Sequence, residues 1–184
     1  SEGERIAGAE AGARLGAAWE ELHLLHSLSG EMTVGASPRD FITRTLAELR
    51  ETLGCRWTAL RVSGPAEQLL DPALGGIVGD GIDAASARRI LSGTPAPARA
   101  LVVGSDLVLA PVRREEQQLG LLVACERTAT AVGGDGAMSN WERTLVETAA
   151  GHLAVFLDNA RLYRDLDAMF MGSLSALVSA IDAK

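Results

Sequence analysis

The chain has 184 residues, of which 47% are hydrophobic and 22% are charged, and its formal net charge is −7. This composition is typical of one globular domain with helical extensions, and it excludes a collagen-like chain, a disordered tail and a disulfide scaffold. The acidic balance argues against non-specific binding to nucleic acid or to anionic membranes. No apolar run approaches the roughly 20 residues that a membrane span needs, so no membrane partner is expected.

Residues 1–33 are predicted to form a helix that is followed by a break at residues 33–36. Apolar residues recur in it at steps of three and four, which is the spacing of one helical face. The members of this face are Leu15, Trp19, Leu22, Leu25, Leu28 and Met32.

A second helix is predicted from Pro38, with Ser37 as its N-cap and Gly54 as its C-terminal stop. A strand is predicted at 55–62 because the segment alternates and contains Trp, Thr and Val. The next segment carries little signal: residues 68–70 are interpreted as a short, weak strand, and the glycine-rich residues 75–81 as a loop.

A short helix is predicted at 82–91, between Asp83 near its start and Gly93 just after it. Three strands should follow, the last two as a hairpin: 100–103, 107–113 and 117–127. The third of these is apolar on both faces, which indicates a central strand covered on two sides.

The final helix is predicted to start at Ser139 or Asn140 and to continue without proline for more than forty residues. Its apolar stripe continues from the first half to the second, with a phase shift between Phe156 and Leu174. A helix this long extends beyond one small domain, so its second half should pack on a partner helix or on a further domain.

Three stretches together resemble a GAF domain. The first is the entry at 22–62, and the second is the hairpin in which residues 107–112 precede a charged turn and residues 119–124. The third is the final helix up to the sequence that ends in Leu162 and Tyr163. The resemblance covers residues 37–163, about two thirds of the chain.

The resemblance implies an α+β, PAS-like fold: an antiparallel sheet of five to six strands flanked by helices, with long N- and C-terminal helices. It implies a dimerisation helix at 1–36, the GAF domain at 37–157 and a linker helix at 158–184. It also implies homodimerisation through the first and last helices. The expected dimer residues are Leu15, Trp19, Leu22, Leu25, Phe156, Tyr163, Leu166 and Phe170.

A ligand pocket, roofed by about residues 64–105, is also implied. Its expected lining residues are Trp57, Arg61, Arg99, Leu109 and Arg113. If the arginines face the pocket, an anionic small molecule is favoured, since arginine binds carboxylate or phosphate with two parallel hydrogen bonds. The alternative is that the arginines face solvent and that Trp57 and Leu109 fill the core. The ligand stays unknown, and the Asn-Lys-Phe-Asp-Glu signature of cyclic-nucleotide-binding GAF domains is missing.

No catalytic or metal site is predicted in the chain itself. His23 and His26 lie three apart on a helix but lack a closing set of ligands. Cys55 and Cys125 fall inside predicted strands and are interpreted as reduced packing residues, which, with no signal peptide in view, favours a cytoplasmic protein.

Residues 171–184 resemble the first helix of an HD-GYP-type metal-dependent phosphohydrolase, in which an Ala-Lys pair precedes the metal ligands. We therefore expect a sensory part of a longer bacterial protein in cyclic di-GMP signalling. In it, small-molecule binding and homodimerisation would control a downstream phosphodiesterase. The alternatives are a ligand-free structural dimerisation module and, third, an enzyme that uses a reactive thiol.

Overall fold

The computed structural model describes residues 37–127 and 140–182 of the chain. The predicted N-terminal helix lies outside these residues, together with Leu15, Trp19, Leu22, Leu25, His23 and His26. The elements in chain order are α2 (Pro38–Leu53), β1 (Cys55–Val62), η1 (Gly64–Leu69), η2 (Pro72–Leu74), β2 (Ile77–Asp80), α3 (Ala84–Ser92), β3 (Leu101–Val103), β4 (Leu107–Arg114), β5 (Gln117–Arg127) and α4 (Asn140–Asp182).

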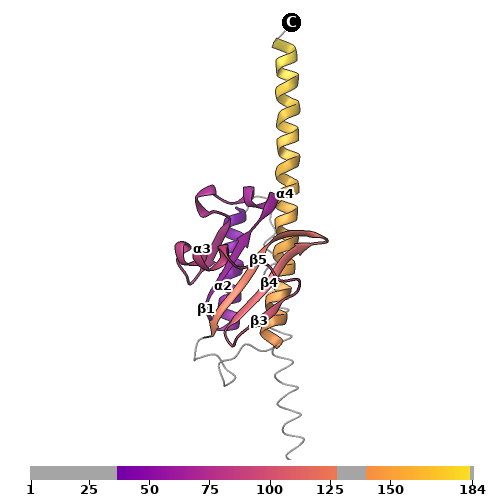
Figure 1. The fold of residues 1–184 in the computed structure, drawn as a ribbon. Helices are drawn as coiled ribbons and strands as arrows, with labels where there is room; N and C mark the ends of the chain where they lie inside the picture. The colour runs from indigo at the N-terminus through magenta and orange to yellow at the C-terminus, as the bar shows by residue number, and fades with distance from the viewer. Residues whose placement is uncertain (1–36, 128–139, 183–184) are drawn as a thin grey trace, which may run out of the picture.

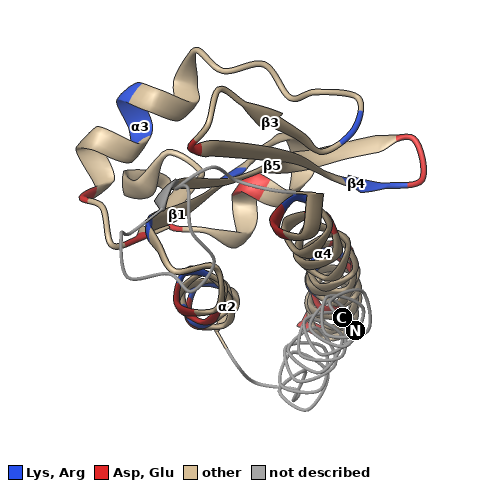
Figure 2. Ribbon diagram, turned by 90° about the horizontal axis from the view of Figure 1, so that it is seen from below, with Lys and Arg blue, Asp and Glu red and all other residues tan. Residues whose placement is uncertain are grey.

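The five strands form one antiparallel sheet in the order β2-β1-β5-β4-β3 (Figure 1). Helices α2 and α4 cover one face of the sheet, and α3 lies on the other (Figure 2). The predicted α+β fold with an antiparallel sheet and a long C-terminal helix is therefore confirmed.

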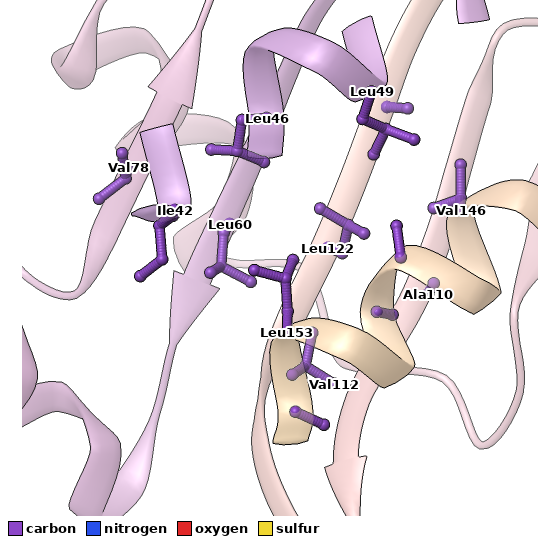
Figure 3. Packing of buried hydrophobic residues seen from close by; sticks show 14 of the residues in the cluster. Ile42, Leu46, Leu49, Leu60, Val78, Ala110, Val112, Leu122, Val146 and Leu153 are labelled. Carbon is purple, nitrogen blue, oxygen red and sulfur yellow. The ribbon is translucent and has the colours of Figure 1, made fainter. Parts of the chain in front are cut away.

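The main core lies between the sheet and the helices α2 and α4. Figure 3 shows side chains of both helices meeting those of β1, β2, β4 and β5. They include Ile42, Leu46, Leu49, Leu60, Ala110, Val112, Leu122, Val146 and Leu153. The buried hydroxyl of Thr58 in β1 donates to the main-chain oxygen of Leu46 in α2 at 2.8 Å, so this buried polar group has a hydrogen-bond partner.

Helix α2 begins and ends where the sequence predicts. Gly54 takes the left-handed conformation at its C-cap, with φ of 60°. Ser37 occupies the N-cap position, but its side chain accepts no capping hydrogen bond. The start of the helix therefore depends on Pro38, whose fixed φ suits the first helical position.

Two predictions between β1 and α3 are wrong. Of the weak strand expected at 68–70, the first two residues instead end the 3₁₀ helix η1, which has Pro65 in its first turn, and Leu70 is the C-cap of that helix. The loop expected at 75–81 contains β2, because Ile77 and Val78 are buried when they pair with Arg61 and Leu60. Glycine content concealed this short edge strand.

A bulge interrupts the β4–β5 hairpin. Val112 pairs with Gly120 and Arg113 pairs with Gln118, so Leu119 is one extra residue on β5. Leu119 is fully buried in the core on the α2 and α4 side. Gly120 beside it lets β1 approach closely, because a Cβ there would lie 2.3 Å from the main-chain oxygen of Arg61.

Replacing Gly120 by alanine should lower the free energy of unfolding by about 1–3 kcal/mol, since an added methyl group must displace the main chain of β1. Gly151 is a matched control: it is an exposed glycine in α4 with no atom within 4 Å of an added Cβ. Gly151→Ala should raise the free energy of unfolding by about 0.5–1 kcal/mol, because alanine favours helix. Urea denaturation measures both values, and equal effects of the two substitutions would contradict this account.

Candidate functional site

The face of the sheet opposite α2 and α4 carries a second, smaller apolar layer, here called the α3-side cluster. Its buried members are Trp57, Ala59, Ile77, Ala87, Leu91, Leu109, Leu121 and Val123. Helix α3 contributes two buried side chains, Ala87 and Leu91. This layer is the part of the fold where the sequence predicts a pocket.

Helix α3 is held at its start by Asp83. The carboxylate of Asp83 accepts hydrogen bonds from the main-chain nitrogens of Ala85 at 3.1 Å and Ser86 at 2.9 Å. Hydrogen bonds from the Ser86 side chain and main chain lower the pKa of Asp83. The helix therefore begins at Ala84, two residues after the predicted start.

The C-terminal end of α3 is held by Arg61, the first of the predicted pocket arginines. Its Nη1 donates to the main-chain oxygens of Leu91 and, at 2.7 Å, of Thr94. The last carbonyls of a helix have no partner within the helix, and a cation there also faces the negative end of the helix dipole. This nitrogen of Arg61 thus fastens α3 to the central strand β1.

The other predicted pocket residues separate into two groups. Trp57 and Leu109 are 6% and 7% exposed and lie together in the α3-side cluster. Arg99 and Arg113 are exposed, and Arg113 lies just beyond the bulge. Of the predicted pocket residues, the structure therefore brings Trp57 and Leu109 together and places Arg61 at the end of α3. It leaves the two remaining arginines at the surface.

An apolar shelf extends this face toward the β3 edge. Leu101 pairs directly with Leu109, and Val103 pairs directly with Leu107, so each pair shares one face of the sheet. Leu101 and Val103 are 37% and 44% exposed. Neither was predicted as a surface residue, because residues 100–103 are all apolar and show no alternation.

Cys55 is not placed to act as a nucleophile. Its sulfur is buried, 3.5 Å from the main-chain oxygen of Trp57, and burial raises its pKa to about 11. A thiol with such a pKa stays protonated near neutral pH and has low reactivity. Within residues 37–127 and 140–182, no group of three His, Cys, Asp or Glu side chains could hold a metal ion.

A set of contacts anchors α4 where it leaves the sheet. Phe156 stacks on Phe41 of α2 with ring centroids 3.8 Å apart. Further along α4, Asp158 lies 3.9 Å from Arg114 of β4, and Arg164 donates to the main-chain oxygen of Gln68 in η1. Leu157 is the last buried residue of α4, and every residue from 162 to 182 is exposed.

The predicted dimer residues of α4 thus differ in surroundings. Phe156 is half-buried against the main core, whereas Tyr163, Leu166 and Phe170 are exposed on the projecting part of the helix. Among the helices that the structure describes, including this one, none is long and apolar enough to cross a membrane.

The fold is that of GAF domains in solved structures. The GAF domain of a candidate sensor histidine kinase from Pseudomonas syringae pv. tomato superposes with a TM-score of 0.56 at 19% identity, covering 89% of this chain and 99% of that one. GAF domains of phosphoenolpyruvate-protein phosphotransferases from Coxiella burnetii and Acinetobacter give TM-scores of 0.52 and 0.50. Their identities are 15% and 12%, with 80% and 79% of this chain and 98% and 97% of theirs covered. No family model and no curated protein matches the sequence.

Replacing Arg61 by methionine should lower the free energy of unfolding by about 1.5–3 kcal/mol, because the carbonyl of Leu91 in the last turn of α3 and that of Thr94 just beyond the helix lose a charged donor. Hydrogen exchange should also accelerate in residues 84–94. Arg99→Met is the control, since Arg99 is exposed, and should change the unfolding free energy by less than about 0.5 kcal/mol. Unchanged exchange in α3 with Arg61→Met would refute the anchoring role.

The Cys55 thiol should resist alkylation at pH 8 in the folded chain and react fully once the chain is unfolded in urea. The raised pKa of Cys55 also makes the free energy of unfolding depend on pH. Above the ordinary value of 9.0 the unfolded chain loses this proton first, so the folded state is progressively destabilised as the pH rises from 9.0 to about 11. Mass spectrometry of alkylated peptides and urea titrations at these pH values measure the two effects. Rapid native alkylation of Cys55 would contradict both.

Proposed function

We propose that the chain is a sensory and regulatory domain of a cytoplasmic bacterial signal-transduction protein. It would act by binding a small molecule, dimerising and controlling an output domain, without catalysis of its own. The observation that carries the proposal is α4, one uninterrupted helix from Asn140 to Asp182. Its first half is part of the core, and its second half projects as an exposed apolar helix.

This arrangement supports regulation because a rigid helix can transmit movement from the domain to whatever follows it. The solved structures with this fold are GAF domains of proteins named as a sensor kinase and as phosphotransferases, which fits a regulatory role. A ligand would shift the balance between two helix arrangements by its difference in affinity for them. The resemblance of residues 171–184 favours an HD-GYP-like phosphodiesterase as the output, in cyclic di-GMP signalling.

The ligand side of the proposal is supported by the α3-side cluster and the apolar shelf. α3 is a short helix with two buried side chains, so this layer can rearrange at lower cost than the main core. Leu101 and Val103 give the shelf an exposed apolar surface. A small molecule with an apolar face fits this surface better than a purely anionic one, because Arg61 already binds the end of α3.

A ligand-free structural dimerisation module is the second candidate. It is favoured by Trp57 and Leu109, which are nearly buried by their neighbours in the α3-side cluster. In that case the domain would hold α4 in position without responding to a small molecule.

Native mass spectrometry of the chain, as expressed and after refolding, tests the proposal. The expected result is a dimer that carries an extra small-molecule mass, which is lost on refolding. Leu174→Asp should raise the dimer dissociation constant at least about 100-fold, because an unpaired carboxylate between two helices is costly. Ser175→Asp, one position away on an exposed part of the same helix, is the matched control and should leave the dimer intact.

The other outcomes are distinct. A dimer without added mass, unchanged by incubation with bacterial metabolite extracts, favours the structural module. A monomer at every concentration would contradict dimerisation in both candidates. If Leu174→Asp and Ser175→Asp weakened the dimer equally, the added charge alone, rather than loss of the apolar face, would be the cause.

A further inference from the structure

The loop between β1 and β2, residues 63–76, closes on itself. The main-chain nitrogen of Val62 donates to the main-chain oxygen of Gly76. A Cβ added at Gly76 would lie 2.7 Å from the main-chain oxygen of Val62, so the two ends of the loop lie in direct contact. A loop of this length whose ends meet is an Ω-loop, which is a compact unit rather than a loose connection.

Apolar packing and a capped turn keep this Ω-loop in one shape. Its side chains in the main core, or packed against it, are Ala66, Leu69, Leu70 and Leu74. The carboxylate of Asp71 accepts a hydrogen bond from the main-chain nitrogen of Ala73 at 2.9 Å and thereby caps η2. Since the Ω-loop consists largely of η1 and η2 and is packed from inside, a displacement of η2 also displaces η1.

Helix α3 contacts the Ω-loop at η2. Nη2 of Arg88 donates to the main-chain oxygens of Ala73 and Leu74, at 3.0 and 3.1 Å. A Cβ added at Gly75 would lie 3.3 Å from Nε of Arg88, so the guanidinium lies directly against the backbone of the loop. A displacement of α3 therefore acts on η2 through Arg88.

Helix α4 contacts the same loop at η1. Arg164 donates to the main-chain oxygen of Gln68, and η1 packs along α4. Arg164 is exposed and lies beyond Leu157, the last buried residue of α4. The contact is therefore made by the part of the helix that leaves the domain.

We propose that the Ω-loop transmits a displacement of α3 to the departing part of α4. The inference rests on the proposed regulatory role and adds the route from the α3-side cluster to the output helix. Such a route needs a continuous physical connection between its two ends, which the loop provides. Arg88 and Arg164 share no partner, so their substitutions should act independently unless the loop couples them.

A second attachment of α4 does not involve the Ω-loop. Asp158 lies 3.9 Å from Arg114 of β4, and Phe156 stacks on Phe41 of α2. Replacing Arg164 therefore removes the hydrogen bond to the loop while the helix stays attached to the sheet and to α2.

Amide hydrogen exchange of the whole chain, followed by mass spectrometry, tests the route. Arg88→Met should accelerate exchange in residues 158–168 of α4 at least about fivefold, although Arg88 contacts η2. Arg89→Met is the matched control, because Arg89 is the next residue of α3 and binds Ser86 of its own helix at 2.9 Å. This control should change exchange in α4 by less than about twofold. Exchange in β5 reports global unfolding and should stay unchanged in both variants.

The same substitution in an Arg164→Met chain shows whether the loop is the route. There, Arg88→Met should accelerate exchange in α4 by less than about twofold, because the contact at the far end of the loop is already lost. An equal acceleration with and without Arg164 would overturn the route. Acceleration by Arg88→Met that is confined to α3 and the Ω-loop would overturn it as well.

These outcomes are separate from those of the proposed function. The exchange measurements require neither a ligand nor a dimer. A chain that is monomeric and carries no added mass by native mass spectrometry would overturn the proposed function and leave the coupling measurable. Conversely, independent effects of Arg88 and Arg164 would overturn the route and leave ligand binding and dimerisation standing.

Discussion

The structure depends on burying both faces of two central strands, β1 and β5. Their backbones pair with each other along seven residue pairs, and their side chains alternate between two apolar layers. Because neither face can be left in water, the chain must supply a cover on each side. Helices α2 and α4 form one cover, and the shorter α3, with Ile82 before it and Ala96 after it, forms the other. The Gly120 contact with Arg61 allows these two strands to approach closely.

The two covers differ in how many buried side chains hold them on the sheet, and this difference makes the α3 side the easier one to displace. On the main-core side, three leucines and an isoleucine of α2 pack with α4 and the sheet. On the other side, α3 depends on two buried side chains, an Asp83 cap and the Arg61 hydrogen bonds. A disturbance from outside would therefore change the α3 side first. The Arg164 contact with Gln68 then lies where the loops after β1 meet the departing α4.

Strong periodicity and clear stop signals made most of the fold predictable from the sequence. β1 and β5 have the predicted bounds, and α2 ends at Gly54 as expected. β2 was not predictable, because its burial comes from pairing with β1, a tertiary effect that the glycines around it concealed. The candidate site was harder still. Whether Arg61, Arg99 and Arg113 face a pocket depends on α3 packing and on the bulge at Leu119, and neither is visible in local sequence.

The continuity of α4 has a consequence for how its length can vary. Each residue inserted between the core and the exposed end would turn everything beyond it by about 100° as well as move it by 1.5 Å. Eleven inserted residues would lengthen the helix by about 16.5 Å and return its apolar side to nearly the same direction. The length of α4 can therefore change only by certain numbers of residues if its apolar side is to keep the same direction. Two proteins that share this domain could place their next domains at different distances only in steps that preserve the rotational phase.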